Sequence, residues 1–127
     1  MIKKVLVTGG AGFIGSHTVD LLLKKNYQVT VIDNLSGGQL SNIEHNLNNP
    51  NFNFIQVDIN EINSEETFFR DVEFIIHFAG IGDIVPSIEQ PINYMRTNVL
   101  GTIKILEAAR KNNVKRFVYA ASSSCYG

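Results

Sequence analysis

The sequence predicts an α/β fold in which one doubly wound parallel sheet of about five strands carries helices on both faces. Two observations predict this fold. Short β-branched and aromatic runs alternate with segments of helical periodicity along all 127 residues, without a repeat or a linker. A glycine-rich turn also joins the first run to the first helical segment. With right-handed crossovers the expected strand order is 3-2-1-4-5, in one domain covering residues 1–127.

Five strands follow from the local patterns. The first, at 2–8, is a β-branched apolar run typical of a parallel strand buried on both faces. The others are expected at 28–32, 52–57, 72–78 and 116–121. Asp33 and Asp58 directly follow the second and third strands.

Helices are expected between the strands. Apolar residues recur at helical spacing over 13–25, a weak polar helix is expected over 40–46, and Asn63 with Glu66 suggests a capping box for a helix ending at Phe69. Residues 82–89 are expected to form a loop, and Pro91 to open a long helix that ends near residue 111. That long helix is expected to turn six apolar residues inward: Ile92, Met95, Val99, Ile103, Ile105 and Leu106.

Charge and composition set bounds on the function. The net charge is −1 without a block of one sign, so bulk electrostatics give no reason to expect nucleic acid or an anionic membrane as a partner. No apolar run approaches the roughly 20 residues of a membrane span. Met1–Lys4 leads directly into a strand, so we expect no signal peptide. Cys125 is the single cysteine, which excludes an internal disulfide and favours a cytoplasmic location.

The turn after the first strand has the composition of a phosphate-binding device. Gly9, Gly12 and Gly15 allow a sharp turn, a close approach by a pyrophosphate and tight packing of helix on strand. The helix that follows directs free N–H groups and its positive dipole end at the phosphates. A glycine triplet alone is weak evidence, because turns before helices often contain glycine.

Asp33 indicates that the ligand of the glycine turn is a dinucleotide. It ends the second strand 18 residues after Gly15, where a dinucleotide-binding fold places a carboxylate for the adenosine ribose hydroxyls. The carboxylate would repel a 2′-phosphate, and no Arg or Lys occurs in residues 34–38 to bind one. The sequence therefore predicts NAD rather than NADP as the cofactor. The alternative is an aspartate that caps a turn or a helix.

Polar and small residues after the other strands fit the same edge of the sheet. Asp58 is placed to reach the adenine amino group with Ile59 beside the ring, although Asp58 alone could equally be a solvated loop acid. The segment Ala79-Gly80 lets the backbone pass close to the pyrophosphate. Asn98 either holds neighbouring backbone or faces solvent, and we favour the first. His77 lies within an apolar strand, which favours a hydrogen-bonded core histidine over a catalytic base.

Six segments together resemble a known family. Thr8-Gly9-Gly10-Ala11-Gly12-Phe13-Ile14-Gly15 resembles the glycine signature of the extended short-chain dehydrogenases/reductases, the NAD-dependent epimerase/dehydratase family. Five further segments match that family in order and span nearly the whole chain: Asp33-Asn34-Leu35, Asp58-Ile59, His77-Phe78-Ala79-Gly80, Asn98-Val99-Leu100-Gly101-Thr102, and Ser122-Ser123-Ser124-Cys125-Tyr126-Gly127. Within the family the sequence is most similar to members that act as 4-epimerases on UDP-glucose or UDP-N-acetylglucosamine. The run 119–124 is especially similar to the latter.

The resemblance implies a Rossmann-type NAD-binding domain and an isomerase. Bound NAD would take a hydride from the sugar C4 and return it to the other face of the 4-keto sugar. The implied cofactor contacts are Gly9, Gly12, Phe13, Ile14, Gly15, Asp33, Asn34, Ser36, Asp58, Ile59, Ala79, Gly80 and Asn98. No metal is implied.

The resemblance also assigns roles to three serines. Ser122 maps to the catalytic hydroxyl, and Ser123 and Ser124 map to positions that line a UDP-sugar substrate. Related dehydratases carry an Asp-Glu pair at the last two positions, and two serines cannot do that acid–base work, so a dehydratase is disfavoured. The structural alternative is a plain serine loop.

Two departures from the family pattern qualify these expectations. No tyrosine of the chain is followed four residues later by a lysine, so the family's Tyr-x-x-x-Lys pair is absent. We therefore expect a truncated, N-terminal part of the enzyme, inactive alone and prone to form a homodimer or to self-associate through an exposed strand edge. Gly82 stands where some members carry a lysine near the cofactor phosphates. Two alternatives remain: another nucleotide-sugar enzyme of the family, such as a decarboxylase or reductase, and a non-enzymatic dinucleotide-sensing module.

Overall fold

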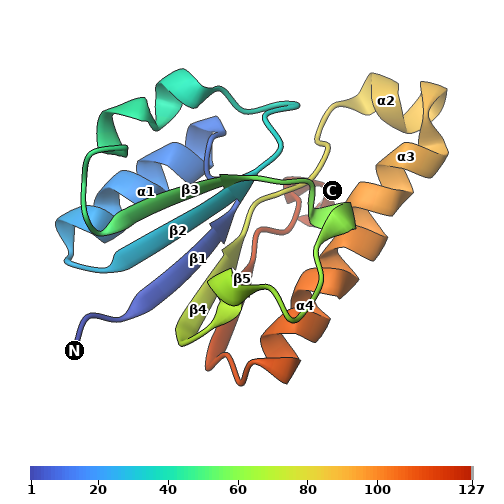
Figure 1. Ribbon diagram of the computed structural model, residues 1–127. Helices are drawn as coiled ribbons and strands as arrows, with labels where there is room; N and C mark the ends of the chain where they lie inside the picture. The colour runs from blue at the N-terminus through green and yellow to red at the C-terminus, as the bar shows by residue number, and fades with distance from the viewer. Residues whose placement is uncertain (127) are drawn as a thin grey trace.

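The computed structural model describes residues 1–126; Gly127, the last residue of the serine segment, lies outside them. Five parallel strands form one sheet in the order β3-β2-β1-β4-β5, which confirms the expected topology (Figure 1). The strand bounds are β1 Lys4–Thr8, β2 Gln28–Asp33, β3 Phe52–Gln56, β4 Val72–His77 and β5 Arg116–Tyr119.

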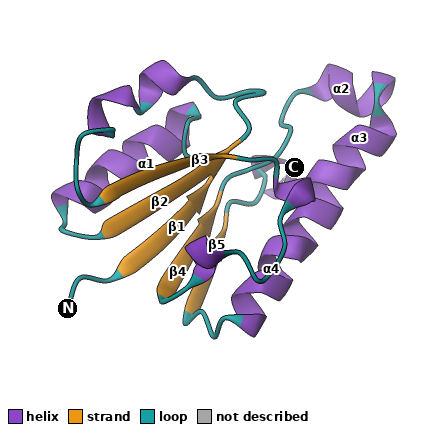
Figure 2. Ribbon diagram, in the orientation of Figure 1, coloured by secondary structure: helices purple, strands orange, loops and turns teal. Residues whose placement is uncertain are grey.

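The sheet is buried on both faces because β1 alternates its side chains between two apolar clusters. Leu6 belongs to a cluster with Ile75 and with Ile105 of helix α4 (Thr102–Lys111). Val5 and Val7 belong to the other cluster, with Val19 of helix α1 (Phe13–Lys24). Figure 2 shows these helices on either side of the fan of strands. A central strand covered on both sides is the arrangement that a continuous apolar run predicts.

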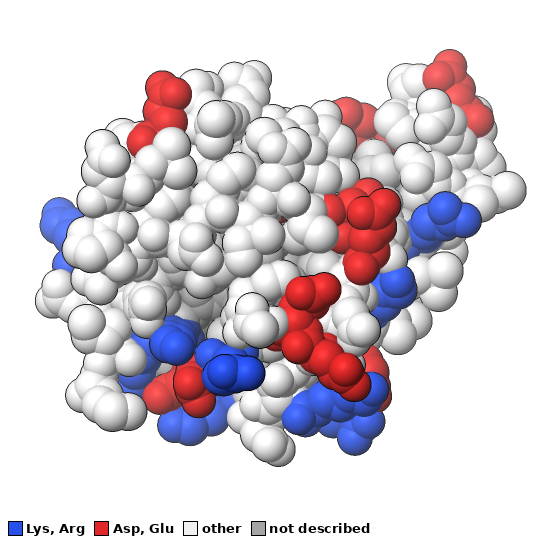
Figure 3. All heavy atoms as spheres, viewed as in Figure 1, with Lys and Arg blue, Asp and Glu red and all other residues white. Residues whose placement is uncertain are grey.

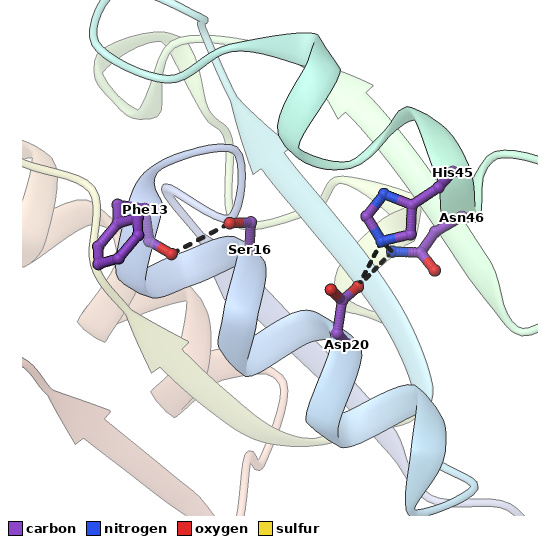
Figure 4. A network of polar contacts seen from close by, with 5 residues as sticks. All are labelled: Phe13, Ser16, Asp20, His45 and Asn46. Atoms are coloured by element: carbon purple, nitrogen blue, oxygen red, sulfur yellow. Dashed lines mark hydrogen bonds and ion pairs between the residues drawn. The ribbon is translucent and has the colours of Figure 1, made fainter.

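Two of the expected helices are wrong in type. Residues 40–46 form two short 3₁₀ turns, η1 (Leu40–Asn42) and η2 (Glu44–Asn46), because only Ile43 of this polar segment is buried. Figure 4 shows what holds η2: His45 Nε2 lies 2.9 Å from Asp20 Oδ1 on α1, and Asn46 donates to the same oxygen at 2.7 Å.

The proposed capping-box helix at 63–69 is reduced to the 3₁₀ turn η4 (Thr67–Phe69). Asn63 does not cap an α-helix; its side chain accepts a hydrogen bond from the Glu65 N–H at 3.1 Å, which closes a local turn instead. Two further 3₁₀ turns, η3 (Ile59–Glu61) and η6 (Ser123–Tyr126), follow β3 and β5.

The expected loop at 82–89 contains a helix, α2 (Ile84–Glu89). Pro86 is compatible with it because it occupies the first turn, where the backbone N–H groups have no partner within the helix. The long helix that begins at Pro91 is confirmed, but it consists of α3 (Pro91–Met95), the π-helical segment η5 (Arg96–Gly101) and α4.

The expected inward face of this long helix is largely wrong. Only Ile105 of the six apolar residues is buried, and the other five are exposed: Ile92, Met95, Val99, Ile103 and Leu106. The helix instead turns Asn98, Gly101 and Thr102 toward the rest of the molecule. Gly101 allows this approach, since a Cβ there would lie 2.5 Å from the Ile59 side chain.

Charged side chains are mixed over the surface. Figure 3 shows acidic and basic groups side by side along the lower rim, below the strands. Three ion pairs between Lys or Arg and an acidic side chain lie among residues 1–126: Lys4–Asp71, Arg110–Glu107 and Lys115–Glu73. Within the same residues, every helix is too short or too polar to cross a membrane.

A buried polar cluster lies where β1, β4 and α4 meet. His77 is 1% exposed, with Nδ1 2.7 Å from Thr8 Oγ1 and Nε2 2.9 Å from Thr102 Oγ1. The expectation of a hydrogen-bonded core histidine is therefore confirmed. Burial lowers the pKa of His77 from 6.5 to about 4, because the charged imidazolium would lose its hydration.

This pKa predicts a pH-dependent stability. Between pH 6.5 and about 4 the unfolded chain binds a proton at residue 77 that the folded chain does not, so the free energy of unfolding falls as the pH falls through this window. The loss should reach roughly 3 kcal/mol. Urea unfolding across this range should show the loss, and His77→Gln should flatten the slope of the free energy of unfolding against pH. Equal slopes in the two proteins would contradict the assignment.

Candidate dinucleotide-binding site

A cleft of about 500 Å³ lies beyond the carboxyl ends of the strands. Its walls come from the glycine turn, the loop after β2 and the segments that follow β3 and β4. Nine of the residues assigned to a cofactor line it: Gly9, Gly12, Asp33, Asn34, Ser36, Asp58, Ile59, Ala79 and Gly80. This is the edge at which ligands bind in open α/β sheets.

A second hollow of about 540 Å³ lies at the opposite end of the sheet. Its charged walls consist of pairs, with Lys4 3.8 Å from Asp71 and Lys115 3.3 Å from Glu73. It lacks the glycine-lined backbone of the first cleft, and we assign no ligand to it.

The glycine turn brings backbone, not side chains, to the floor of the cleft. Gly9 adopts φ +67°, and a Cβ on it would lie 2.7 Å from the Ala79 nitrogen. A Cβ on Gly15 would collide with the Gly9 carbonyl oxygen. Both positions therefore require glycine, one for its conformation and both for the close approach of two backbone segments.

The first turn of α1 is open to an anion. Gly12 is the N-cap and, in the described part of the chain, no side chain caps this end or places an acid in its first turn. The backbone N–H groups of such a turn and the helix dipole attract negative charge. Phe13 and Ile14 lie in this turn with exposed side chains and do not line the cleft, and Gly15 packs against the Gly9 backbone.

Asp33 connects the turn to the loop after β2. Its Oδ2 accepts a hydrogen bond from the Ala11 N–H at 2.9 Å, and its Oδ1 accepts one from the Leu35 N–H at 2.8 Å. Asp33 is 7% exposed and lines the cleft. Asp33 thus caps local backbone, as the alternative interpretation held, and its carboxylate can still accept further hydrogen bonds in the cleft, since each oxygen accepts more than one.

The loop after β2 and the segment after β3 are ordered by their own side chains. Asn34 Oδ1 accepts from the Ser36 N–H at 3.0 Å and from its hydroxyl at 2.7 Å. Asp58 Oδ1 accepts from the Asn60 N–H at 2.8 Å, so this acid caps η3. Ile59 is only 4% exposed, which limits what it can offer an adenine ring.

Asn98 holds the wall that follows β4. Its Oδ1 accepts from the Ile81 N–H at 2.7 Å and its Nδ2 donates to the Ile81 carbonyl at 2.9 Å. A Cβ on Gly80 would lie 3.1 Å from Asn98 Oδ1. The expectation that Asn98 holds neighbouring backbone is confirmed, and it acts from behind the wall.

The three serines are not brought into the cleft wall. Ser122, Ser123 and Ser124 are exposed at the end of β5, where Ser122 Oγ accepts from the Ser124 N–H at 3.1 Å. Their roles stay predictions. Within residues 1–126 no group of three His, Cys, Asp or Glu side chains could hold a metal.

Several residues of the cleft escaped the sequence analysis. Thr97, Gln90 and Asn93 line its wall on the helical side. Thr8 lies beneath its floor, where the hydroxyl oxygen accepts a hydrogen bond from the Ala79 N–H and contacts His77 Nδ1. Thr8 could have been found as the one polar residue at the end of a buried apolar strand. The other three were not singled out, because Gln90 directly precedes the long helix and the inward face of that helix was assigned to its apolar residues.

Comparison with known proteins gives the family. Residues 5–127 match the NAD dependent epimerase/dehydratase family. UDP-glucose 4-epimerase from Homo sapiens is 39% identical over 137 residues, covering 100% of this chain and 39% of that protein.

Two solved structures share the fold. The UDP-N-acetylglucosamine 4-epimerase from Methanobrevibacter ruminantium, in complex with UDP-N-acetylmuramic acid, gives a TM-score of 0.91 at 36% identity, over 99% of this chain and 40% of that one. The UDP-glucose-4-epimerase from Stenotrophomonas maltophila, with bound NAD and formylated UDP-arabinopyranose, gives a TM-score of 0.88 at 29% sequence identity. That match covers 98% of this chain and 38% of that one. This chain spans about 39% of the length of relatives such as those from Methanocaldococcus jannaschii and Homo sapiens, and 92% of the UDP-glucose 4-epimerase from Klebsiella pneumoniae. The motif-based resemblance is thereby confirmed, and the chain belongs to the NAD dependent epimerase/dehydratase family.

Proposed function

We propose that this chain is the NAD-binding portion of a UDP-sugar 4-epimerase. One observation carries the proposal: the glycine turn, the uncapped start of α1 and the Asp33 carboxylate meet in one cleft at the carboxyl ends of the strands. The relatives that match over this region are named as UDP-sugar 4-epimerases, which supports the substrate class.

The residues present fit a dinucleotide. The missing Cβ atoms at Gly9 and Gly15 let backbone segments meet closely, and the tight turn that results directs the N–H groups of α1 toward a pyrophosphate. Asp33 accepts hydrogen bonds from the ribose hydroxyls, and the absence of Arg and Lys from residues 34–38 leaves a 2′-phosphate without a partner.

The chemistry is shared between cofactor and chain. When bound, NAD supplies the hydride acceptor and donor for the sugar C4. Ser122 is the hydroxyl that we assign to the sugar, and Ser123 and Ser124 line it. No Tyr-x-x-x-Lys pair occurs in residues 1–127, so we expect this chain by itself to bind NAD without epimerising a UDP-sugar.

Cofactor preference tests the role of Asp33. Calorimetry should show tighter binding of NAD than of NADP, and Asp33→Ala should weaken NAD binding roughly 10- to 100-fold through loss of hydrogen bonds to a charged group. Asp71→Asn, at the opposite end of the sheet, serves as the control and should bind as the unaltered chain does. Tighter binding of NADP by the unaltered chain would overturn the assignment.

Two glycine substitutions test the phosphate cradle. Gly15→Ala should lower both the urea midpoint and NAD affinity, because the new Cβ collides with the Gly9 carbonyl and pushes α1 off the turn. Gly37→Ala is the matched control, since that residue lines the same cleft with no atom within 4 Å of the added Cβ. Equal effects from the two changes would argue against the cradle.

Self-association follows from exposed apolar surface. β5 is an edge strand with Val118 47% and Tyr119 56% exposed, and we propose that copies of this chain pair along it. Light scattering should show dimers or larger species, reduced by Val118→Lys but not by Leu21→Lys on α1, which is similarly exposed. A monomer at high concentration would contradict the proposal.

A further inference from the structure

His77 has no part in the proposed function, yet it lies directly beneath the cleft. It is the last residue of β4, and the cleft wall begins at the next residue, Phe78. Its two ring nitrogens contact two different threonines, Thr8 at the end of β1 and Thr102 at the start of α4.

The surrounding hydrogen bonds select one tautomer of the ring. Thr102 Oγ1 donates its single hydrogen to the Asn98 carbonyl at 2.8 Å, so it accepts from His77 Nε2–H. Nδ1 then carries no hydrogen and accepts from the Thr8 hydroxyl, whose oxygen accepts in turn from the Ala79 N–H at 3.1 Å. This is the one tautomer in which all four hydrogen bonds form together.

The network makes hydrogen bonds to both ends of the wall after β4, at Ala79 and at Ile81. Through Thr8 it holds the Ala79 nitrogen, the atom that lies against Gly9 of the glycine turn. Through Thr102 it holds the backbone of Asn98, whose side chain binds both polar backbone atoms of Ile81. Displacement of the ring would therefore shift this wall relative to the glycine turn.

We propose that His77, as the neutral Nε2–H tautomer, is a positioning residue that sets the distance between the Ala79–Ile81 wall and the glycine turn, and so the affinity for the dinucleotide. The identity of the ligand as a dinucleotide rests on the proposed function, whereas the hydrogen-bond network around His77 is independent of it. His77 touches no part of the cofactor and acts through Thr8 and Thr102.

The first test needs no ligand. Nitrogen-15 NMR of the His77 ring at neutral pH should show Nε2 protonated and Nδ1 unprotonated. A proton on Nδ1 would overturn the proposal, because Thr8 would then have no acceptor for its hydroxyl.

The second test measures NAD affinity by calorimetry in Thr102→Val, which keeps the shape of the side chain and removes its hydroxyl. Thr102 does not line the cleft, yet the variant should bind NAD roughly 3- to 10-fold more weakly, the value of one or two neutral hydrogen bonds. Thr102→Ser should restore the affinity. Thr30→Val, in the middle of β2, is the matched control and should bind normally.

Unchanged NAD affinity in Thr102→Val would overturn the proposal. If that variant does not fold, His77→Asn replaces it, since the shorter amide keeps an acceptor for Thr8 and loses the donor to Thr102; the same weakening is expected, and unchanged affinity again overturns the proposal.

The positioning role of His77 can be tested even if the proposed function is wrong. If the unaltered chain binds no NAD, amide hydrogen exchange decides: Thr102→Val should speed exchange at Ile81 by roughly tenfold more than at Val7, which lies in the core of β1. Equal acceleration at both sites would show a general loss of stability and overturn the positioning role.

Discussion

The close approach of the Gly9 backbone to the segment after β4 is the constraint on which the rest of the site depends. A Cβ on Gly9 would lie 2.7 Å from the Ala79 nitrogen, while the Gly9 N–H donates to the Ile32 carbonyl at 2.9 Å. At Gly9 the ends of β1, β2 and β4 therefore meet backbone against backbone. Without this meeting there would be neither a floor for the cleft nor a start for α1 that faces it.

Polar side chains around the cleft serve mainly to hold backbone. Asp33 binds the N–H groups of Ala11 and Leu35, and Asn98 binds both polar backbone atoms of Ile81. Buried polar groups are stable in such places only when their hydrogen bonds are satisfied. The same bonds that make the loops rigid also fix the cleft in advance of a ligand, which reduces the entropy lost on binding.

The long helix shows how hydrogen bonding can outweigh apolar periodicity. Asn98 and Thr102 are four residues apart on one face, and both have partners in the loop or strand behind the cleft. Turning that face inward satisfies these groups and leaves Ile92, Met95 and Ile103 exposed. The π-helical segment η5 lies at this place, as such segments do at many functional sites.

The sequence alone determined the sheet, its strand order and the position of the glycine turn, because apolar runs and glycines act through local conformation and burial. It also placed Asp33, Asp58, Ala79 and Gly80 at the cleft, since the carboxyl ends of parallel strands share one edge. Only the tertiary structure decided the inward face of the helix at 91–111 and the pairing of His77 with Thr8 and Thr102. Those contacts join residues 69 and 25 positions apart, and a periodicity read along the chain contains no information about which distant group will satisfy a polar side chain.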